Sequence, residues 1–315
     1  MNYSCSTPVL LIFFNRPDTF AKVFEKVREA KPKTLILAQD GPRNENDVAG
    51  INECRKIAES VDWECEVIRQ YSDVNLGCGV RPQSAISFAL EKYESVIILE
   101  DDCVPSPSFF PYCEELLEKY KDDERIGYIS GLNHFETWDC GDQDYFFAKA
   151  GSIGAWATWR RAWKPHYDYY AENINDPYVV KLYQQQVGDK YIANSRIQSL
   201  KKANNSLNNG EKLSYWDTQW GFAHYTQGLM VIVPKKNLIC NIGVGASSTH
   251  ATKLTTTKYV KYKNIVFIPT YLLEFPLKHP KACVADLEYH TLIYKCSRPS
   301  WIKRAAAKIL RHNKH

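Results

Sequence analysis

The segment Ser95-Val96-Ile97-Ile98-Leu99-Glu100-Asp101-Asp102 decides the fold class, because a continuous apolar run leads directly into three acids. An apolar run without alternation is typical of a strand that is buried on both faces, as in a parallel sheet. Alternate side chains of a strand point to opposite sides, so at least two of the three carboxylates should share one rim. Such carboxylates can hold Mg²⁺ or Mn²⁺, and a solvated loop after the strand is the alternative.

The residues before this segment alternate between strand and helix patterns. Apolar runs predict further strands at 9–14, 34–38 and 65–68, and helices are expected around 18–27, over 51–59 and from Pro82. This alternation predicts a doubly wound α/β sheet. Ligands of such sheets bind beyond the carboxyl ends of the strands, where Arg16, Asp40 and the acidic triplet are expected to lie.

The second half of the chain has a less regular pattern. A helix is expected over 107–120, and the stretch 131–225 is rich in Trp and Tyr. The polar residues 195–211 predict a loop. Two strands, over 229–233 and 238–242, are expected to return the chain to the sheet.

Composition and charge limit the function classes. The chain has 315 residues, 44% hydrophobic and 24% charged, which is typical of a soluble globular protein. A net charge of +4, with acids spread among the bases, does not favour nucleic-acid binding. The ten cysteines include no CxxC pair, and the apolar run 9–14 is too short for a signal peptide or a membrane span. We therefore expect reduced thiols in a cytoplasmic protein.

Several segments resemble one enzyme family. The stretch 97–110, IILEDDCVPSPSFF, is similar to the hydrophobic-EDD-x-x-x-x-P-x-F-F segment of N-acetylglucosaminyltransferase I and of related bacterial polysaccharide and O-antigen glycosyltransferases. Residues 10–16 resemble the first strand of this family with its terminal Arg, and 37–41 resemble a second strand that ends in a QD pair. Residues 154–163, 241–245 and 249–250 resemble the bacterial members. The resemblance covers about residues 8 to 250, in order.

The resemblance implies a GT-A fold, a Rossmann-like nucleotide-diphospho-sugar transferase with a mixed, mostly parallel sheet flanked by helices. It also implies a nucleotide-sugar donor, with a UDP-sugar favoured, and Mn²⁺ or Mg²⁺ as cofactor. Asp102 would be the direct metal ligand, and Glu100 and Asp101 would contact the ribose or the donor sugar. Asp40 would hydrogen-bond the base, and Arg16 would bind the base or the diphosphate.

Two further residues are candidates for the donor side. Arg81 follows the glycine-containing loop 75–79, in the region where such enzymes place basic donor-binding residues, although a surface arginine would fit the sequence equally well. His250 follows another glycine-containing loop and is a candidate for contact with the metal or the diphosphate, with a structural histidine as the alternative.

The acceptor side depends on the segment Tyr215-Trp216-Asp217-Thr218-Gln219-Trp220. Inverting transfer needs a general base, and the segment resembles the family segment in which an Asp beside a Trp has that role. Asp217 is the candidate, although Thr218 stands where the family has a second acid, and a helix N-cap is the alternative role. Among the tryptophans, Trp156 and Trp216 are the candidates for stacking on an acceptor sugar, and burial in the core is their alternative.

These expectations describe a metal-dependent, inverting hexosyl- or N-acetylhexosaminyltransferase. Its acceptor would be a saccharide or a lipid-linked saccharide in bacterial surface polysaccharide synthesis. A nucleotidyltransferase is an alternative, although 15–18 is not glycine-rich as its phosphate loop would be. A sugar-nucleotide-binding protein without transfer activity is another alternative, and the spacing of the acids does not exclude a glycoside hydrolase.

The expected organisation has three parts: a donor-binding half over 1–105, an acceptor-binding and catalytic half of the same domain over 106–260, and an extension over 261–315. The basic residues of the last nineteen positions include Lys303, Arg304, Lys308, Arg311 and Lys314, and these positions hold no acid. An apolar stripe there predicts an amphipathic helix that could bind an anionic membrane at the inner face, with a solvated tail as the alternative.

Overall fold

The fold is built on one nine-stranded sheet. The structure, a computed structural model, describes residues 3–211, 213, 215–243 and 266–298. Within these residues the strand order is β11-β7-β9-β6-β8-β4-β1-β2-β3. The bounds are β1 Val9–Phe13, β2 Thr34–Gln39, β3 Glu66–Tyr71, β4 Ser95–Glu100, β6 Ile126–Ser130, β7 Tyr145–Ala148, β8 Ala155–Trp159, β9 Met230–Pro234 and β11 Ala285–Asp286.

The sheet is mixed and mostly parallel. Strand β1 pairs in parallel with β2 and β4, and β3 continues the parallel set beyond β2. Strand β8 lies between β4 and β6 and is antiparallel to both. The expected α/β class with a mixed, mostly parallel sheet is therefore confirmed. Because β1, β2 and β4 are parallel, their carboxyl ends lie at one edge of the sheet.

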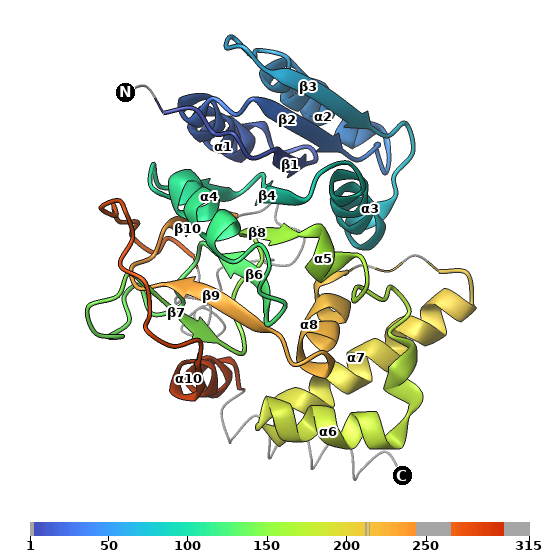
Figure 1. The fold of residues 1–315 in the computed structure, drawn as a ribbon. Helices are drawn as coiled ribbons and strands as arrows, with labels where there is room; N and C mark the ends of the chain where they lie inside the picture. The colour runs from blue at the N-terminus through green and yellow to red at the C-terminus, as the bar shows by residue number, and fades with distance from the viewer. Residues whose placement is uncertain (1–2, 212, 214, 244–265, 299–315) are drawn as a thin grey trace.

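Helices cover both faces of the sheet and enclose two apolar cores. One core contains residues from α1 Pro17–Ala30, α2 Glu45–Ala58 and α4 Phe109–Lys119. The other contains residues from α3 Gly77–Lys92, α5 Arg160–Trp163, α6 Pro177–Val187, α7 Lys190–Asn208, α8 Asp217–Thr226 and α10 Leu287–Ser297. Figure 1 shows α6, α7 and α8 gathered as one group beside the sheet. The 3-10 helix η1, Glu172–Asn175, directly precedes α6 in the sequence.

A second, two-stranded sheet lies beside the acidic segment. Strand β5 Cys103–Pro105 follows the three acids and pairs antiparallel with β10 Ile239–Asn241. The expectation that 238–242 returns to the main sheet is wrong for this strand, because β9 fills that position. The second sheet instead continues to the backbone of Asp102, whose carbonyl accepts a hydrogen bond from the Ile242 amide at 2.8 Å.

The loop predicted over 195–211 is a helix for most of its length. Residues Lys190–Asn208 form α7, which begins where the Asp189 side chain accepts hydrogen bonds from the amides of Tyr191 and Ile192. Its buried residues are Ala193, Ile197, Leu200 and Ala203. Spacings of three and four residues place them on one face. The many Asn, Ser and Lys residues lie between them, and this polar composition led to the wrong prediction.

Other helix starts also differ from the sequence patterns. Helix α3 begins at Gly77, five residues before Pro82, and α2 begins at Glu45 instead of residue 51. The Asn44 side chain caps α2 by accepting a hydrogen bond from the Asn46 amide. Among the described helices, none is long and apolar enough to cross a membrane. The basic and apolar residues of the amphipathic tail predicted at the C-terminus lie in 299–315, outside the described residues, whereas 266–298 of the predicted extension are described.

Candidate functional site

Arg16 joins the ends of two neighbouring strands. It follows β1, and its Nη1 donates a hydrogen bond to Oδ2 of Asp102 at 3.0 Å. Its Nε lies 3.4 Å from Oδ2 of Asp101, and Nη2 pairs with the other oxygen of that carboxylate. The Phe14 amide donates to Oδ2 of Asp101 at 3.2 Å. Asp101 is therefore buried and engaged with Arg16, and its role in this structure is to position that guanidinium.

The three acids repel one another where little water reaches them. Burial raises the pKa of Glu100 well above its usual range, and the charges of Asp102 and Asp101 raise it further, while Arg16 opposes them. Burial also raises the pKa of Asp101 to about 6, although Arg16 lowers it. No described residue donates a hydrogen bond to the Glu100 carboxylate. The rim therefore has excess negative charge, which favours binding of a further cation.

Asp102 is the member of the triplet that lies at the rim. Its side chain is 13% exposed, and the Cys103 thiol donates to its Oδ1 at 3.3 Å. The backbone of Gly243 approaches the same carboxylate so closely that a Cβ at that position would overlap Oδ2. The chain that follows β10 therefore forms a wall against Asp102, and only glycine leaves room for it.

Asp40 lies at the same sheet edge, but its carboxylate is occupied. Its Oδ1 accepts from the amides of Gly41 and Leu76 at 3.0 and 2.7 Å, and Oδ2 accepts from the Gly77 amide at 2.8 Å. The Asn75 side-chain amide donates to Oδ2 at 3.2 Å. Through these bonds Asp40 fixes the conformation of the 75–77 loop. Both of its carboxylate oxygens already accept two hydrogen bonds, which disagrees with the expected direct contact of Asp40 with a nucleobase.

Arg81 is a buried cation beside this loop. It is 7% exposed, and one Nη donates to the carbonyl of Gln70 at the end of β3. Burial lowers the pKa of its guanidinium, and Asp40 opposes this effect. Its Nε has no hydrogen-bond partner, and among the described residues no carboxylate forms an ion pair with it. The alternative of a surface arginine is thus excluded, and an anionic ligand would satisfy the buried Nε, while the role of Arg81 in binding a nucleotide sugar stays a prediction.

Asp217 is the first residue of α8, and its side chain is exposed. It does not cap the helix, because Trp216 holds the N-cap position without a side-chain hydrogen bond. No described residue donates to its carboxylate. The charge of Asp217 nevertheless raises the pKa values of Glu100 and Cys78, in each case after the larger effect of burial. Within the described residues this carboxylate therefore has no hydrogen-bond donor, and it lies near the acidic rim.

A contact between backbones places Leu213, four residues before Asp217, against α3. Gly79, in the first turn of α3, lies against Leu213, and a Cβ on Gly79 would overlap the Leu213 carbonyl oxygen. The segment that enters α8 is thereby held against the loop shaped by Asp40. The loop shaped by Asp40 and the segment that leads into α8 therefore lie side by side.

The tryptophans lie beneath this site, inside the core. Trp156 has no exposed surface, and Trp216 is 5% exposed. Their rings stack with centroids 6.0 Å apart and an interplanar angle of 20°. Trp163 stacks in turn on Tyr167, at 4.1 Å. Stacking of an acceptor sugar on Trp156 or Trp216 disagrees with this burial, because neighbouring aromatic rings already cover their faces.

The fit of a divalent metal depends on Asp102. The described residues contain no group of three or more His, Cys, Asp or Glu side chains that could enclose a metal ion. Mg²⁺ and Mn²⁺ in phosphoryl sites need fewer protein ligands, because one or two carboxylates act together with water and substrate phosphates. Asp102 fits that arrangement. His250, the other predicted ligand, lies outside the described residues.

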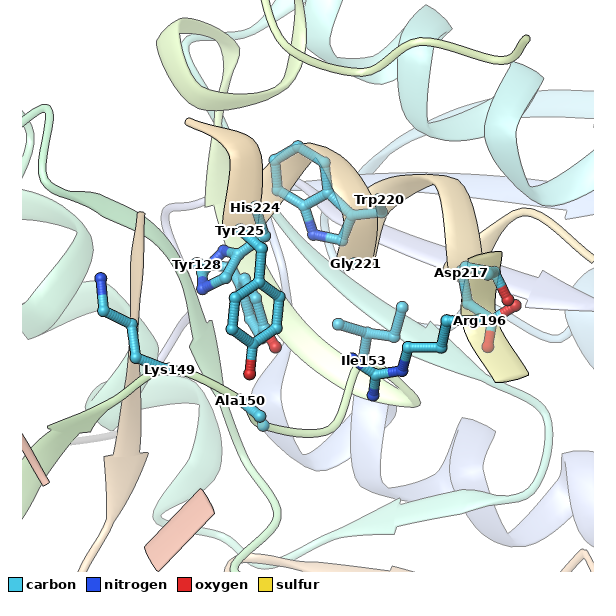
Figure 2. Close-up of a pocket in the computed structure, with 12 residues that line it drawn as sticks. Tyr128, Lys149, Ala150, Ile153, Arg196, Asp217, Trp220, Gly221, His224 and Tyr225 are labelled. Carbon is cyan, nitrogen blue, oxygen red and sulfur yellow. The ribbon is translucent and has the colours of Figure 1, made fainter. Parts of the chain in front are cut away.

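A cavity of about 150 Å³ begins beside Asp217. Figure 2 shows Asp217 at one end of its lining and Lys149 at the other. The lining residues are Tyr128, Lys149, Ala150, Gly151, Ile153, Arg196, Asp217, Thr218, Trp220, Gly221, His224 and Tyr225. Sequence reasoning missed Arg196 because its stretch was interpreted as a loop, and nothing in the pattern around Lys149 marks it.

Comparisons with known proteins found solved structures that are similar to this chain, and three of them are described here. No family model and no curated protein matches the chain. Mouse xyloside xylosyltransferase 1 is 11% identical with a TM-score of 0.34, over 71% of this chain and 83% of that one. Glucosyl-3-phosphoglycerate synthase from Mycobacterium tuberculosis, solved with Mn²⁺, UDP and phosphoglyceric acid, is 15% identical with a TM-score of 0.28. That match covers 50% of this chain and 56% of the mycobacterial chain.

The third structure is a UDP-glucose pyrophosphorylase complexed with UDP-glucose. It is 12% identical with a TM-score of 0.26, over 49% of this chain and 69% of that one. The three proteins are thus two glycosyltransferases and one nucleotidyltransferase. At these TM-scores the likenesses carry no argument about the activity of this chain.

Proposed function

We propose that this chain is a GT-A type glycosyltransferase that uses a nucleoside-diphosphate sugar. One observation carries the proposal: Asp217 is exposed, accepts no hydrogen bond from the described residues, and lies near a rim of acids at the carboxyl ends of β1 and β4. The distance along the chain between these groups is more than a hundred residues, yet the charge of Asp217 raises the pKa of Glu100. A carboxylate that can take a proton beside a rim that favours a cation is the arrangement that metal-assisted sugar transfer requires.

The donor half of the proposed site is formed by Asp102, Arg16 and Arg81. Asp102 would hold Mn²⁺ or Mg²⁺, which when bound neutralises negative charge on a nucleoside diphosphate. Arg16 is kept at the rim by Asp101 and would bind the diphosphate from the protein side. Arg81 offers its unpartnered Nε to the same anionic group. Glu100 is left for a hydroxyl of the ribose or of the donor sugar.

The acceptor half is the region beside Asp217. In a single displacement the acceptor hydroxyl oxygen forms a bond to the anomeric carbon as the bond from that carbon to the diphosphate oxygen breaks. The proton of the acceptor hydroxyl passes to Asp217, and the electron pair of the broken bond leaves with the nucleoside diphosphate. The product has the inverted anomeric configuration. Asp217 accepts no hydrogen bond from the described residues, so its lone pairs are available for this proton.

The proposal extends to the sugar and to the setting. A hexosyl or N-acetylhexosaminyl group from a UDP-sugar would pass to a saccharide or a lipid-linked saccharide in bacterial surface polysaccharide synthesis. Residues 1–105 would supply the donor half and 106–260 the acceptor half. The basic C-terminal tail would hold the enzyme at the inner face of the membrane.

The decisive experiment is a thermal-shift screen of nucleotide sugars with and without Mn²⁺, followed by an assay of sugar release from the donors that bind. We expect a metal-dependent rise in melting temperature with at least one UDP-sugar, and turnover of that donor. Asp102→Asn should lose both effects, whereas Asp122→Asn, which removes an exposed acid, should keep them.

Other outcomes of the same experiment would support the competing functions. Donor binding without any turnover would indicate a sugar-nucleotide-binding protein. Release of pyrophosphate from a nucleoside triphosphate and a sugar phosphate would indicate a nucleotidyltransferase. Undiminished metal-dependent binding by Asp102→Asn would remove Asp102 from the metal site.

A further inference from the structure

The cavity beside Asp217 is lined by two basic side chains and one acid. Arg196 extends from α7, and Lys149 follows β7, whereas Asp217 is the sole carboxylate among the lining residues. Figure 2 shows the Arg196 side chain on the same side of the cavity as Asp217, with Lys149 beyond Tyr225. The cavity therefore carries two positive charges and one negative charge, with Asp217 at one end of its lining.

Arg196 lacks a carboxylate partner. Its Nη1 donates to the Tyr294 hydroxyl at 3.1 Å, and its guanidinium lies 5.1 Å from the centre of the same ring. Among the residues that the structure describes, no Asp or Glu forms an ion pair with it. A guanidinium has five N–H donors, and a cation withdrawn from water is costly unless it is paired. The hydroxyl groups of Tyr183, Tyr225 and Tyr294 lie close to this guanidinium and hold Arg196 in position, but none of them is a carboxylate that could pair with its charge.

Lys149 adds to the positive potential. Its Nζ donates to the carbonyl of Gly228 at 3.1 Å, and no described carboxylate pairs with it. His224 lies in the same lining, where burial lowers its pKa to about 3 and both Lys149 and Arg196 contribute to the lowering. His224 is thus neutral, and neither of its ring nitrogens has a hydrogen-bond partner. The two cations have no carboxylate partner among the described residues, and together with His224 they line one small space.

We propose that this cavity is a subsite for an anionic acceptor, namely a sugar residue that carries a carboxylate or a phosphate group recognised by Arg196 and Lys149. The identification of the ligand as an acceptor rests on the proposed function, in which Asp217 takes the proton of the acceptor hydroxyl. Arginine binds a planar carboxylate through two parallel hydrogen bonds, which fits a guanidinium that has no carboxylate partner among the described residues.

The volume agrees with a small ligand group. Sites that enclose a whole drug-sized ligand measure roughly 300–1,000 Å³. The cavity, at about 150 Å³, is suited to a single charged sugar residue or its anionic substituent, with the rest of the acceptor outside. The anion would bind beside Arg196, and the reacting hydroxyl would lie near Asp217 at the end of the cavity.

The test compares charged and neutral sugars at constant ionic strength. NMR titrations of the full chain with glucuronate, galacturonate and glucose 6-phosphate should show saturable binding, and glucose and galactose should bind at least ten-fold more weakly. A stronger response to the uronates than to glucose 6-phosphate assigns a carboxylate, and the reverse assigns a phosphate. Equal binding of charged and neutral sugars, or no binding of any charged sugar, would overturn the proposal.

Substitutions of Arg196 test whether the anionic sugar binds at this residue. Arg196→Met should weaken binding of the preferred anionic sugar by roughly 10- to 100-fold, the range expected for the loss of charge-assisted hydrogen bonds. Arg196→Lys keeps the charge without the paired donors and should show a smaller loss, which distinguishes recognition from misfolding. Lys201→Gln removes an exposed cation from the same helix and should bind as the wild type does. Unchanged binding in Arg196→Met would contradict the assignment.

Donor turnover in the same preparations tests the proposed function separately. A chain that binds uronates through Arg196 but never consumes a nucleotide sugar would refute sugar transfer and leave the anion subsite intact. A chain that transfers sugar to neutral acceptors and ignores charged ones would refute only the subsite.

Discussion

Nη1 of Arg16 lies 3.0 Å from Oδ2 of Asp102, although 86 positions separate the two residues in the chain. The parallel pairing of β1 with β4 explains this, because the register sets Ile12 opposite Glu100. Both strands therefore end together, and the residues that follow them meet at one edge. The same guanidinium also holds Asp101. A single cation thus keeps two carboxylates in place at the point where we expect the donor to bind.

Replacing Arg16 by Met should destabilise the fold and abolish donor binding. The substitution leaves Asp101 and Asp102 without their cation, and removing one partner of a buried pair costs about 3–5 kcal/mol. Urea denaturation at pH 7 measures the free energy of unfolding. Arg69→Met breaks a pair whose side chains are 48% and 42% exposed, and it should cost about 1 kcal/mol or less. Equal losses in the two variants would contradict the role of Arg16 as the centre of the cluster.

Asp217→Asn should remove turnover and preserve the fold. Loss of a general base lowers kcat by roughly 10²- to 10⁴-fold. The side chain is exposed and accepts no hydrogen bond from described residues, so the free energy of unfolding should change by no more than the roughly 1 kcal/mol of a charge at a helix N-terminus. Steady-state kinetics with a donor that binds, together with a donor titration of the variant, test both statements. Normal kcat in this variant would remove Asp217 from the mechanism.

Two glycine-to-alanine substitutions should have opposite effects on stability. Gly79→Ala introduces a methyl group where the Leu213 carbonyl lies, and overpacking of this kind costs about 1–3 kcal/mol. Gly221→Ala, within α8, meets no atom within 4 Å and should stabilise the chain by about 0.5–1 kcal/mol through its better helix propensity. Thermal unfolding of both variants provides the comparison. Stabilisation by Gly79→Ala would show that α3 and the 213 backbone can separate without cost.

His224 should make stability depend on acid pH. Its folded-state pKa of about 3 lies below the ordinary value of 6.5, so the unfolded chain binds a proton that the folded chain rejects. The stability due to the neutral ring is complete above pH 6.5 and is lost as the pH falls from about 6.5 toward 3. At 1.4 kcal/mol per pKa unit, the loss between pH 7 and 4 is about 3 kcal/mol.

The matched variant for this effect is His224→Phe, which keeps an aromatic ring and removes the titrating nitrogens. Urea denaturation of both proteins at several pH values should give curves that diverge below pH 6.5, with the wild type losing more stability. Parallel curves would show that His224 does not control the acid response.

The strand that ends in Glu100 could be predicted from sequence, and so could the position of Arg16 at a neighbouring strand end. Both depend on local apolar runs and on the rule that parallel strands end at one edge. Which acid pairs with Arg16 could not be predicted, because the pairing depends on side-chain directions after the strand has ended. The occupation of Asp40 by the 75–77 loop also arises from a tertiary contact.

Helix α7 shows where composition misleads. It has few large apolar residues, such as Ile197 and Leu200, so the helical periodicity of its sequence is weak. The Asn and Ser residues around them favour turns in isolation. Packing against its neighbouring helices stabilises it in the fold. Because this stretch was predicted to be a loop, Arg196 was not recognised as a candidate site residue. Burial of Trp156 and Trp216 was equally hidden, because an aromatic-rich stretch is compatible with a ligand platform and with a core.

The close approach of Gly79 to Leu213 bears on how such a chain could be altered. A segment such as 1–105 looks like a module that could be exchanged with that of another enzyme to change the sugar delivered. Its third helix, however, is fitted to a backbone contributed by the other half, and β8 from that half is inserted next to β4. A chimaera joined at residue 105 would lose both matched surfaces at once. Under the proposed function, a change of sugar preference is therefore better sought through point substitutions than through recombination.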